Sequence, residues 1–178
     1  AALAIHGRTR ADRFRGAAEY ETIARVKECV SIPVIANGDI TTTEKSLEVL
    51  RLTNADGLMI GRGAQGRPWI FRELRTLIDP TAETTQLGND DLRAIMLGHL
   101  DELHRFYGES TGVRVARKHL TWYCENLANA DEFRYQVVRV GSAQEQIRLT
   151  EQFFSGMNES GTEEQQAIEI QDQQEAAL

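Results

Sequence analysis

The chain has 178 residues, of which 41% are hydrophobic and 26% charged, a balance typical of a globular protein with one or two domains. No apolar run is long enough to cross a bilayer and no signal-peptide pattern opens the sequence, so we expect no membrane association. The net charge of −7 lies almost entirely in residues 158–178, which hold six acidic residues and no Lys or Arg, so a nucleic-acid partner is not excluded.

Three short apolar stretches in residues 1–79 each end in a polar segment that contains glycine. They read LAIHGRT, IPVIANGDI and GLMIGRGA, and Leu58-Met59-Ile60 in the last is predicted to be a buried strand. Helical patterns separate them. Short apolar strands that alternate with helices indicate βαβ units and a parallel sheet.

The two helical patterns between these strands are amphipathic. YETIARVKECV is predicted to place one face inward through Ile23, Val26 and Val30. TTTEKSLEVLRLT begins with a capping-box signature, Thr41-x-x-Glu44. Its inward side chains are predicted to be Leu47, Leu50 and Leu52.

Three parallel strands cannot close a barrel, and alone they would leave open sheet edges. A (β/α)8 barrel takes about 250 residues. We therefore predict an α/β fold in which residues 1–79 form the last three βα units of a TIM (β/α)8 barrel, so that the chain is a fragment. A small open α/β sheet is the alternative.

Residues 80–157 are predicted to form a small all-α helical domain. A polar linker, DPTAETTQLGND, opens this region and no strand pattern follows it. One helix is predicted from a cap at Asn89 or Asp90 to Tyr107, a second along GVRVARKHLTWYCENLA, and a third from a capping box at Ser142 to about residue 157.

The acidic, Gln-rich end of the chain, residues 158–178, contains no aromatic residue and is predicted to be a disordered tail or a fraying helix. The cysteines, Cys29 and Cys124, form no C-x-x-C pair. They indicate a reducing compartment, the cytoplasm, and are predicted to be small buried residues.

Glycines and an arginine follow the last two predicted strands. Gly38, Gly61 and Gly63 would let backbone N–H groups approach an anion, and Arg62 would supply charge and two donors matched to phosphate. Phosphate sites in TIM barrels often form in the loops after strands seven and eight. Alternatively, the glycines serve tight turns and Arg62 pairs with a carboxylate such as Asp39.

A phosphate site alone fits a sugar phosphate, a nucleotide or flavin mononucleotide (FMN). His6 ends the strand before this pair. It could hydrogen-bond a cofactor ring or be satisfied by nearby backbone, and the residues alone leave both possibilities open.

The strings AIHGRTR, IPVIANGDI and GLMIGRGAQGRPWIF, in this order, resemble the tRNA-dihydrouridine synthases, most closely the bacterial B type. RVARKHLTWY resembles the carboxyl-terminal domain of that type. The resemblance covers roughly residues 1–156. It implies a TIM barrel with a helical tRNA-binding domain, and an FMN-dependent oxidoreductase whose flavin is reduced by NADPH and reduces a tRNA uracil to dihydrouracil.

The resemblance also implies roles for single residues. Asn37, Gly38 and Asp39, with Gly61 and Arg62, match the FMN contacts of the family. His6 matches its flavin-contacting histidine. A cysteine acid and a flavin-contacting lysine lie upstream of IHGRT in the family, and neither cysteine of this chain matches that position, so no catalytic residue is assigned and the chain alone is expected to be inactive.

Three cations in the helical region, Arg114, Arg117 and Lys118, lie opposite an apolar stripe formed by Val113, Ala116, Leu120, Tyr123 and Leu127. Such clusters commonly contact RNA phosphates, so we predict that this face binds tRNA. A solvated helix face without a ligand is the alternative.

Two other functions fit parts of the pattern. One is a phosphate-binding barrel without flavin, such as an aldolase or isomerase. The other is a non-catalytic RNA-binding fragment. No protein partner is indicated.

Overall fold

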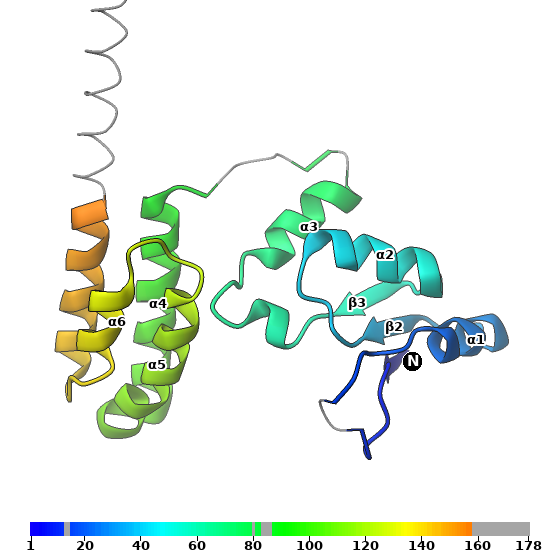
Figure 1. The fold of residues 1–178 in the computed structure, drawn as a ribbon, viewed down its shortest axis with the longest axis horizontal. Helices are drawn as coiled ribbons and strands as arrows, with labels where there is room; N and C mark the ends of the chain where they lie inside the picture. Colours follow the sequence, from blue (N-terminus) through cyan, green and yellow to red (C-terminus); the bar gives the residue numbers. More distant parts are fainter. Residues whose placement is uncertain (13–14, 80, 83–86, 158–178) are drawn as a thin grey trace, which may run out of the picture. The chain divides into compact units, whose positions relative to one another are not determined.

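The computed structural model describes residues 1–12, 15–79, 81–82 and 87–157 of the chain. The chain divides into two compact units, Ala1–Thr84 and Thr85–Leu178 (Figure 1). The predicted tail, residues 158–178, and part of the predicted linker lie outside the described residues.

The first unit is built on a three-stranded parallel sheet, as predicted. Its strands are β1 (Leu3–His6), β2 (Val34–Asn37) and β3 (Gly57–Met59), in the order β1-β2-β3. Helix α1 (Glu21–Cys29) connects β1 to β2, and α2 (Thr43–Thr53) connects β2 to β3 (Figure 1). After β3 the chain forms a short 3-10 helix, η1 (Arg62–Ala64), and then α3 (Ile70–Ile78).

The core of the first unit lies where α1 and α2 cover the sheet. Its fully buried members include Ile23 on α1, Val34 and Ala36 on β2, and Val49 on α2. Side chains of β2 alternate between buried and half-buried positions, as expected of the central strand.

The cap of α2 is one residue later than predicted. The cap is Thr42 rather than Thr41: its backbone is extended, and its Oγ1 accepts a hydrogen bond from Lys45 N at 3.1 Å. Thr41, Thr42 and Thr43 have the same side chain for capping, and the structure places the middle one at the cap. The helix is capped by Asn54, whose N–H donates to Leu50 O and whose left-handed φ of 48° turns the chain out of the helix.

The predicted burial of two apolar side chains, Met59 and Leu52, was wrong. Met59 in β3 is 48% exposed and Leu52 on α2 is 54% exposed. Among the described residues β3 pairs with β2 alone, so one edge of it carries no neighbouring strand. The side of α2 that is buried runs through Ser46, Val49 and Thr53 instead.

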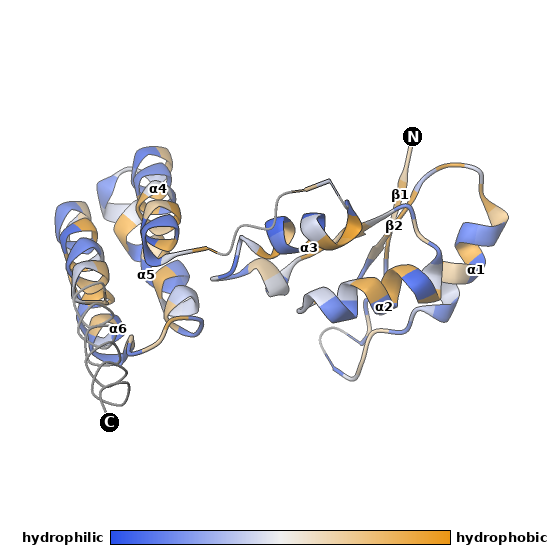
Figure 2. Ribbon diagram, turned by 90° about the horizontal axis from the view of Figure 1, so that it is seen from above, coloured by the Kyte–Doolittle hydropathy of each residue, from blue (hydrophilic) through white to orange (hydrophobic). Residues whose placement is uncertain are grey.

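The second unit is helical, as predicted, and contains α4 (Asn89–Tyr107), α5 (Glu109–Cys124), α6 (Asp131–Val137) and a helix over residues 143–157. Hydrophobic and hydrophilic residues alternate along these helices in the amphipathic manner (Figure 2). Helices α4 and α5 pack closely at Gly112, where a Cβ would lie 2.8 Å from His104 Cα.

Three details differ from the predictions for this region. Helix α4 begins at Asn89, so its cap is Gly88 rather than Asn89 or Asp90. Helix α5 begins at Glu109 and ends at Cys124, and it therefore excludes Leu127. Helix α6 was not predicted at all. The cap at Ser142 is confirmed, because its Oγ accepts from Glu145 N at 3.2 Å.

Most of the predicted apolar stripe of α5 is buried. Val113, Ala116, Leu120 and Tyr123 are each at most 3% exposed, and Met96, Leu100 and Phe154 of the same unit are buried to the same degree. No described helix is both long and apolar enough to span a membrane.

Candidate functional site

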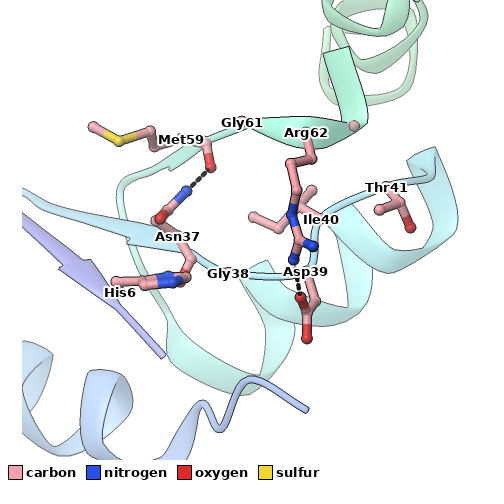
Figure 3. Close-up of a pocket in the computed structure, with 10 residues that line it drawn as sticks. His6, Asn37, Gly38, Asp39, Ile40, Thr41, Met59, Gly61 and Arg62 are labelled. Carbon is pink, nitrogen blue, oxygen red and sulfur yellow. Dashed lines mark hydrogen bonds and ion pairs between the residues drawn. The ribbon is translucent and has the colours of Figure 1, made fainter. Parts of the chain in front are cut away.

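The ends of the three strands meet in a small hollow of about 150 Å³. The sheet register aligns His6 with Asn37 and Asn37 with Met59, so the residues that follow each strand reach the same edge. The lining comes from the three strand ends and the loops after β2 and β3 (Figure 3). All six predicted cofactor-binding residues line it: His6, Asn37, Gly38, Asp39, Gly61 and Arg62. The structure therefore brings together residues that lie up to 56 positions apart.

Asn37 ties the ends of β2 and β3 together across this hollow. Its Nδ2 donates to the carbonyl oxygen of Met59 at 2.5 Å. Figure 3 shows the Asn37 side chain directed at that oxygen. This bond holds the ends of β2 and β3 together and so restrains the distance between the starts of the loops that follow these strands.

Asp39 is held in place by a nearly buried arginine. Arg8, whose side chain is 4% exposed, donates from Nη1 to Oδ1 at 2.7 Å and from Nη2 to Oδ2 at 2.5 Å. Ala18 N donates to the same carboxylate at 2.8 Å. The hydrogen-bonded Arg8 guanidinium, with smaller help from Ala18 N, holds the pKa of Asp39 below its usual value. These bonds also fix the left-handed backbone of Asp39, whose φ is 49°.

Sequence reasoning overlooked Arg8. It follows Gly7 shortly after β1, much as Arg62 follows Gly61 shortly after β3. That repeated Gly-Arg pattern was the available signal. Beyond Asp39, Arg8 donates to the carbonyl oxygens of Arg15 and Gly16, so it organises the loop after β1.

Arg62 contacts Asp39 and also faces solvent. Its Nη2 lies 3.2 Å from Asp39 Oδ1, and its side chain is 54% exposed (Figure 3). The carboxylate alternative for Arg62 is thus present in the structure. It does not remove the positive charge of the hollow, because Arg8 already neutralises Asp39 and the three groups together carry one net positive charge.

The two glycines beside Arg62 have different surroundings. A Cβ on Gly63 would lie 2.3 Å from Ile40 O, so this glycine allows the loop after β3 to touch the loop after β2. A Cβ on Gly61 would meet nothing within 4 Å among the described residues. Gly61 therefore borders open space in the hollow, where a ligand group has room.

His6 has one ring nitrogen near backbone. Nδ1 lies 3.2 Å from Asn37 O, which is an acceptor only, so a hydrogen bond there requires a proton on Nδ1. In the neutral ring Nε2 is then an acceptor. Both predicted possibilities for His6 are compatible with this geometry, since Nδ1 can donate to the backbone while Nε2 stays available for a cofactor ring.

The three predicted RNA-binding cations on α5 differ in exposure. Arg114 and Lys118 are exposed, and Lys118 Nζ lies 4.9 Å above the Trp122 ring centroid. Arg117 is half-buried, and its Nη2 donates to Val140 O at 3.0 Å. The prediction of three equivalent solvent-facing cations was wrong for Arg117, because the chain after α6 packs over it.

A model of the dihydrouridine synthase family matches residues 1–158 of this chain. The chain belongs to the dihydrouridine synthase family. The match spans the strands that form the hollow and the helices of the second unit.

Curated relatives agree with this family assignment. The chain is 50% identical over 161 residues to a tRNA-dihydrouridine synthase B of Pseudomonas aeruginosa, which covers 90% of this chain and 48% of the relative. It is 47% identical over 176 residues to a tRNA-dihydrouridine synthase B of Pseudomonas putida, and this match covers 99% of the chain and 50% of the relative. It is 48% identical over 156 residues to a tRNA-dihydrouridine synthase B of Vibrio cholerae, and this match covers 88% of the chain and 49% of the relative. The chain spans about half the length of these relatives.

Neither cysteine of the chain lines the hollow. Cys29 is exposed at the end of α1, which corrects the prediction that it is buried. Cys124 is buried on α5, as predicted, and burial raises the pKa of its thiol to about 11. The described residues thus place no thiol beside the hollow.

Proposed function

We propose that this chain is the carboxyl-terminal portion of an FMN-dependent enzyme that reduces uridine in tRNA to 5,6-dihydrouridine, with NADPH as the reductant. Family membership and the names of the relatives support the reaction and the tRNA substrate. The observation that carries the cofactor part is the hollow at the ends of β2 and β3, which combines an exposed arginine with open space at Gly61.

The donor set of the hollow suits an anionic group such as the FMN phosphate. Arg62 would neutralise it and donate hydrogen bonds, while Gly61 leaves room for its oxygens. Asp39 would orient Arg62, because their 3.2 Å contact restrains the guanidinium while Arg8 keeps the carboxylate ionised. The site is thus pre-organised, which lowers the entropy lost on binding.

His6 and Asn37 would contact the non-phosphate part of the cofactor. His6 Nε2 can accept a hydrogen bond if Nδ1 donates to Asn37 O. A bound flavin supplies the hydride for reduction of the uracil ring. The chain's own residues in this unit bind and orient, and the proton donor and the rest of the flavin site would come from a further part of the barrel.

The second unit would hold tRNA and act with the barrel in the cytoplasm. Its exposed cations Arg114 and Lys118 lie on α5, away from the buried stripe. Phosphate contacts of this kind position an RNA without reading its sequence.

The proposal is tested with the full-length protein, unmodified tRNA, FMN and NADPH. The expected result is dihydrouridine in the tRNA, detected by nucleoside mass spectrometry, and none without FMN or without NADPH. Residues 1–178 alone should give no dihydrouridine and bind FMN weakly. Dihydrouridine formation that is independent of flavin, or tight stoichiometric FMN binding by residues 1–178, would contradict the proposal.

An absorbance spectrum separates the competing functions. A flavin spectrum in the purified full-length protein, with peaks that bleach on addition of NADPH, supports the proposal. A phosphate-binding aldolase or isomerase, or a non-catalytic RNA-binding protein, would show neither.

A further inference from the structure

A groove between α5 and α6 gathers cations in an otherwise acidic region. Residues 80–157 contain eight Lys and Arg residues against eleven Asp and Glu. Four of those eight cations line this one groove, which encloses about 530 Å³ and has one carboxylate in its described lining, that of Asp131. They are Arg117 and Lys118 of α5, and Arg134 and Arg139 of α6 and the turn after it.

An exposed aromatic ring stands in the same groove. Tyr135 is 58% exposed, and the guanidinium carbon of Arg139 lies 3.7 Å from its ring centroid. Arg139 Nη1 also donates to Tyr135 O at 2.5 Å, which holds the guanidinium over the ring. The pair forms a flat, positively charged surface beside the remaining cations.

This combination of groups favours unpaired RNA over a protein ligand. Unpaired bases stack on tyrosine rings and on arginine planes, while cations beside them contact the backbone phosphates. The fully buried core of a protein–protein interface is more apolar than the rest of the surface and is depleted of charged residues. In the described lining of this groove, Val138 is the aliphatic side chain, and the rest is charged, hydroxylic or Tyr135.

We propose that the groove between α5 and α6 binds an unpaired stretch of RNA, with one base stacked on the Tyr135–Arg139 pair and phosphates at Lys118 and Arg134. Arg117 supports the groove wall through its bond to Val140 O. The proposal rests on the proposed tRNA function for its biological substrate, but the groove and its ligand chemistry are argued from this unit alone.

The site differs from the surface predicted from sequence. That surface was a single face of α5 that includes Arg114, whereas the groove adds α6 and an aromatic stack and has no Arg114 in its described lining. The two surfaces make different predictions, because phosphate contacts alone do not distinguish single strands from duplexes in the way that base stacking does.

The test measures binding of the 178-residue chain to a fluorescein-labelled 12-nucleotide oligouridylate and to a 12-base-pair RNA duplex, by anisotropy over a salt series. Tyr135→Ala should weaken oligouridylate binding fivefold or more, about the loss of one base stack, and change duplex binding less than twofold. Tyr135→Phe should stay within twofold for both. Arg139→Gln should weaken oligouridylate and make its salt dependence shallower.

A matched control removes a cation outside the groove. Arg148, on the helix over residues 143–157, is 48% exposed and paired with Glu145, so Arg148→Gln should leave binding and salt dependence unchanged. Less than a fivefold loss for Tyr135→Ala, an effect of Arg148→Gln equal to that of Arg139→Gln, or no oligouridylate binding by the unsubstituted chain would each overturn the proposal. A polyglutamate peptide that binds as tightly as oligouridylate and loses as much with Tyr135→Ala would show a site for acidic protein instead.

Dihydrouridine formation by the full-length protein separates this proposal from the proposed function. If Tyr135→Ala changes neither tRNA turnover nor oligouridylate binding, the groove proposal is wrong and the proposed enzyme function stands. If RNA binding depends on Tyr135 but the full-length protein forms no dihydrouridine, the groove proposal stands and the proposed enzyme function is wrong.

Discussion

Replacing Gly63 with alanine would place a methyl group 2.3 Å from Ile40 O and 2.9 Å from Thr41 Cα. Both contacts are to backbone, so no side chain can rotate away. Because Cβ atoms essentially never come within 3.0 Å of such neighbours, the two loops would have to separate by at least about 0.7 Å. Overpacking of this kind costs about 1–3 kcal/mol, which corresponds to a fall in melting temperature of about 5–20 °C for a unit of this size.

Gly61→Ala is the matched control for this prediction. It adds the same methyl group two residues away, where nothing lies within 4 Å, so the free energy of unfolding should change by no more than about 0.5 kcal/mol. Because Gly61 lines the hollow, Gly61→Ala in the full-length protein should weaken FMN binding without loss of stability.

Unfolding of the first unit can be followed selectively, because the chain has two tryptophans and one lies in each unit. In a Trp122→Phe background, Trp69 fluorescence reports urea denaturation of the unit that holds the hollow. Equal stability of the Gly63→Ala and Gly61→Ala variants, or a larger loss for Gly61→Ala, would refute the contact between the two loops.

Three further predictions follow from burial and charge. Lys118→Ala should leave the melting temperature of the chain unchanged and lower the magnitude of the negative slope of log tRNA affinity against log salt by about 0.7–0.9. Arg117→Ala should in addition destabilise the chain by about 1 kcal/mol through loss of its backbone hydrogen bond. Because the pKa of Asp39 is lowered, its ionised form stabilises the fold at pH values above its unfolded pKa of about 3.9, and this stabilisation is lost as the pH falls through the lower folded pKa. Asp39→Asn should therefore reduce the fall in the free energy of unfolding at acidic pH, measured by urea denaturation at a series of pH values. Ellman's reagent should react rapidly with exposed Cys29 and slowly with buried Cys124, whose pKa is about 11.

The sequence was sufficient to predict the elements whose pattern is local. Strand–helix alternation gave the three parallel strands, and the polar segments after them gave the lining of the hollow, because the carboxyl ends of parallel strands share one edge. The apolar stripe of α5 was likewise readable from its spacing.

The errors concern properties that depend on neighbours distant in sequence. Met59 belongs to an apolar run, but its exposure depends on whether a strand pairs beside β3. Arg117 has the helical spacing of an exposed cation, yet Val140 lies over it. Arg8 was overlooked because its partner, Asp39, is 31 residues away. The seven-residue α6 is too short for its periodicity to be recognised.

We propose above all that the hollow at the ends of β2 and β3 binds the phosphate of FMN through Arg62. The most direct measurement is the affinity of the full-length apoprotein for FMN and for riboflavin, which lacks the phosphate, with Arg62→Gln compared with unsubstituted protein. Arg67→Gln is the control, since Arg67 lies in the same segment, pairs with Glu73 and is absent from the lining of the hollow.

A charge-assisted hydrogen bond contributes about 1.5–3 kcal/mol, and the lower end applies to Arg62 because its side chain is 54% exposed. We expect Arg62→Gln to weaken FMN binding roughly tenfold and to leave riboflavin affinity unchanged, while Arg67→Gln changes neither affinity. Equal weakening of FMN and riboflavin by Arg62→Gln, or no effect on FMN, would contradict the proposal.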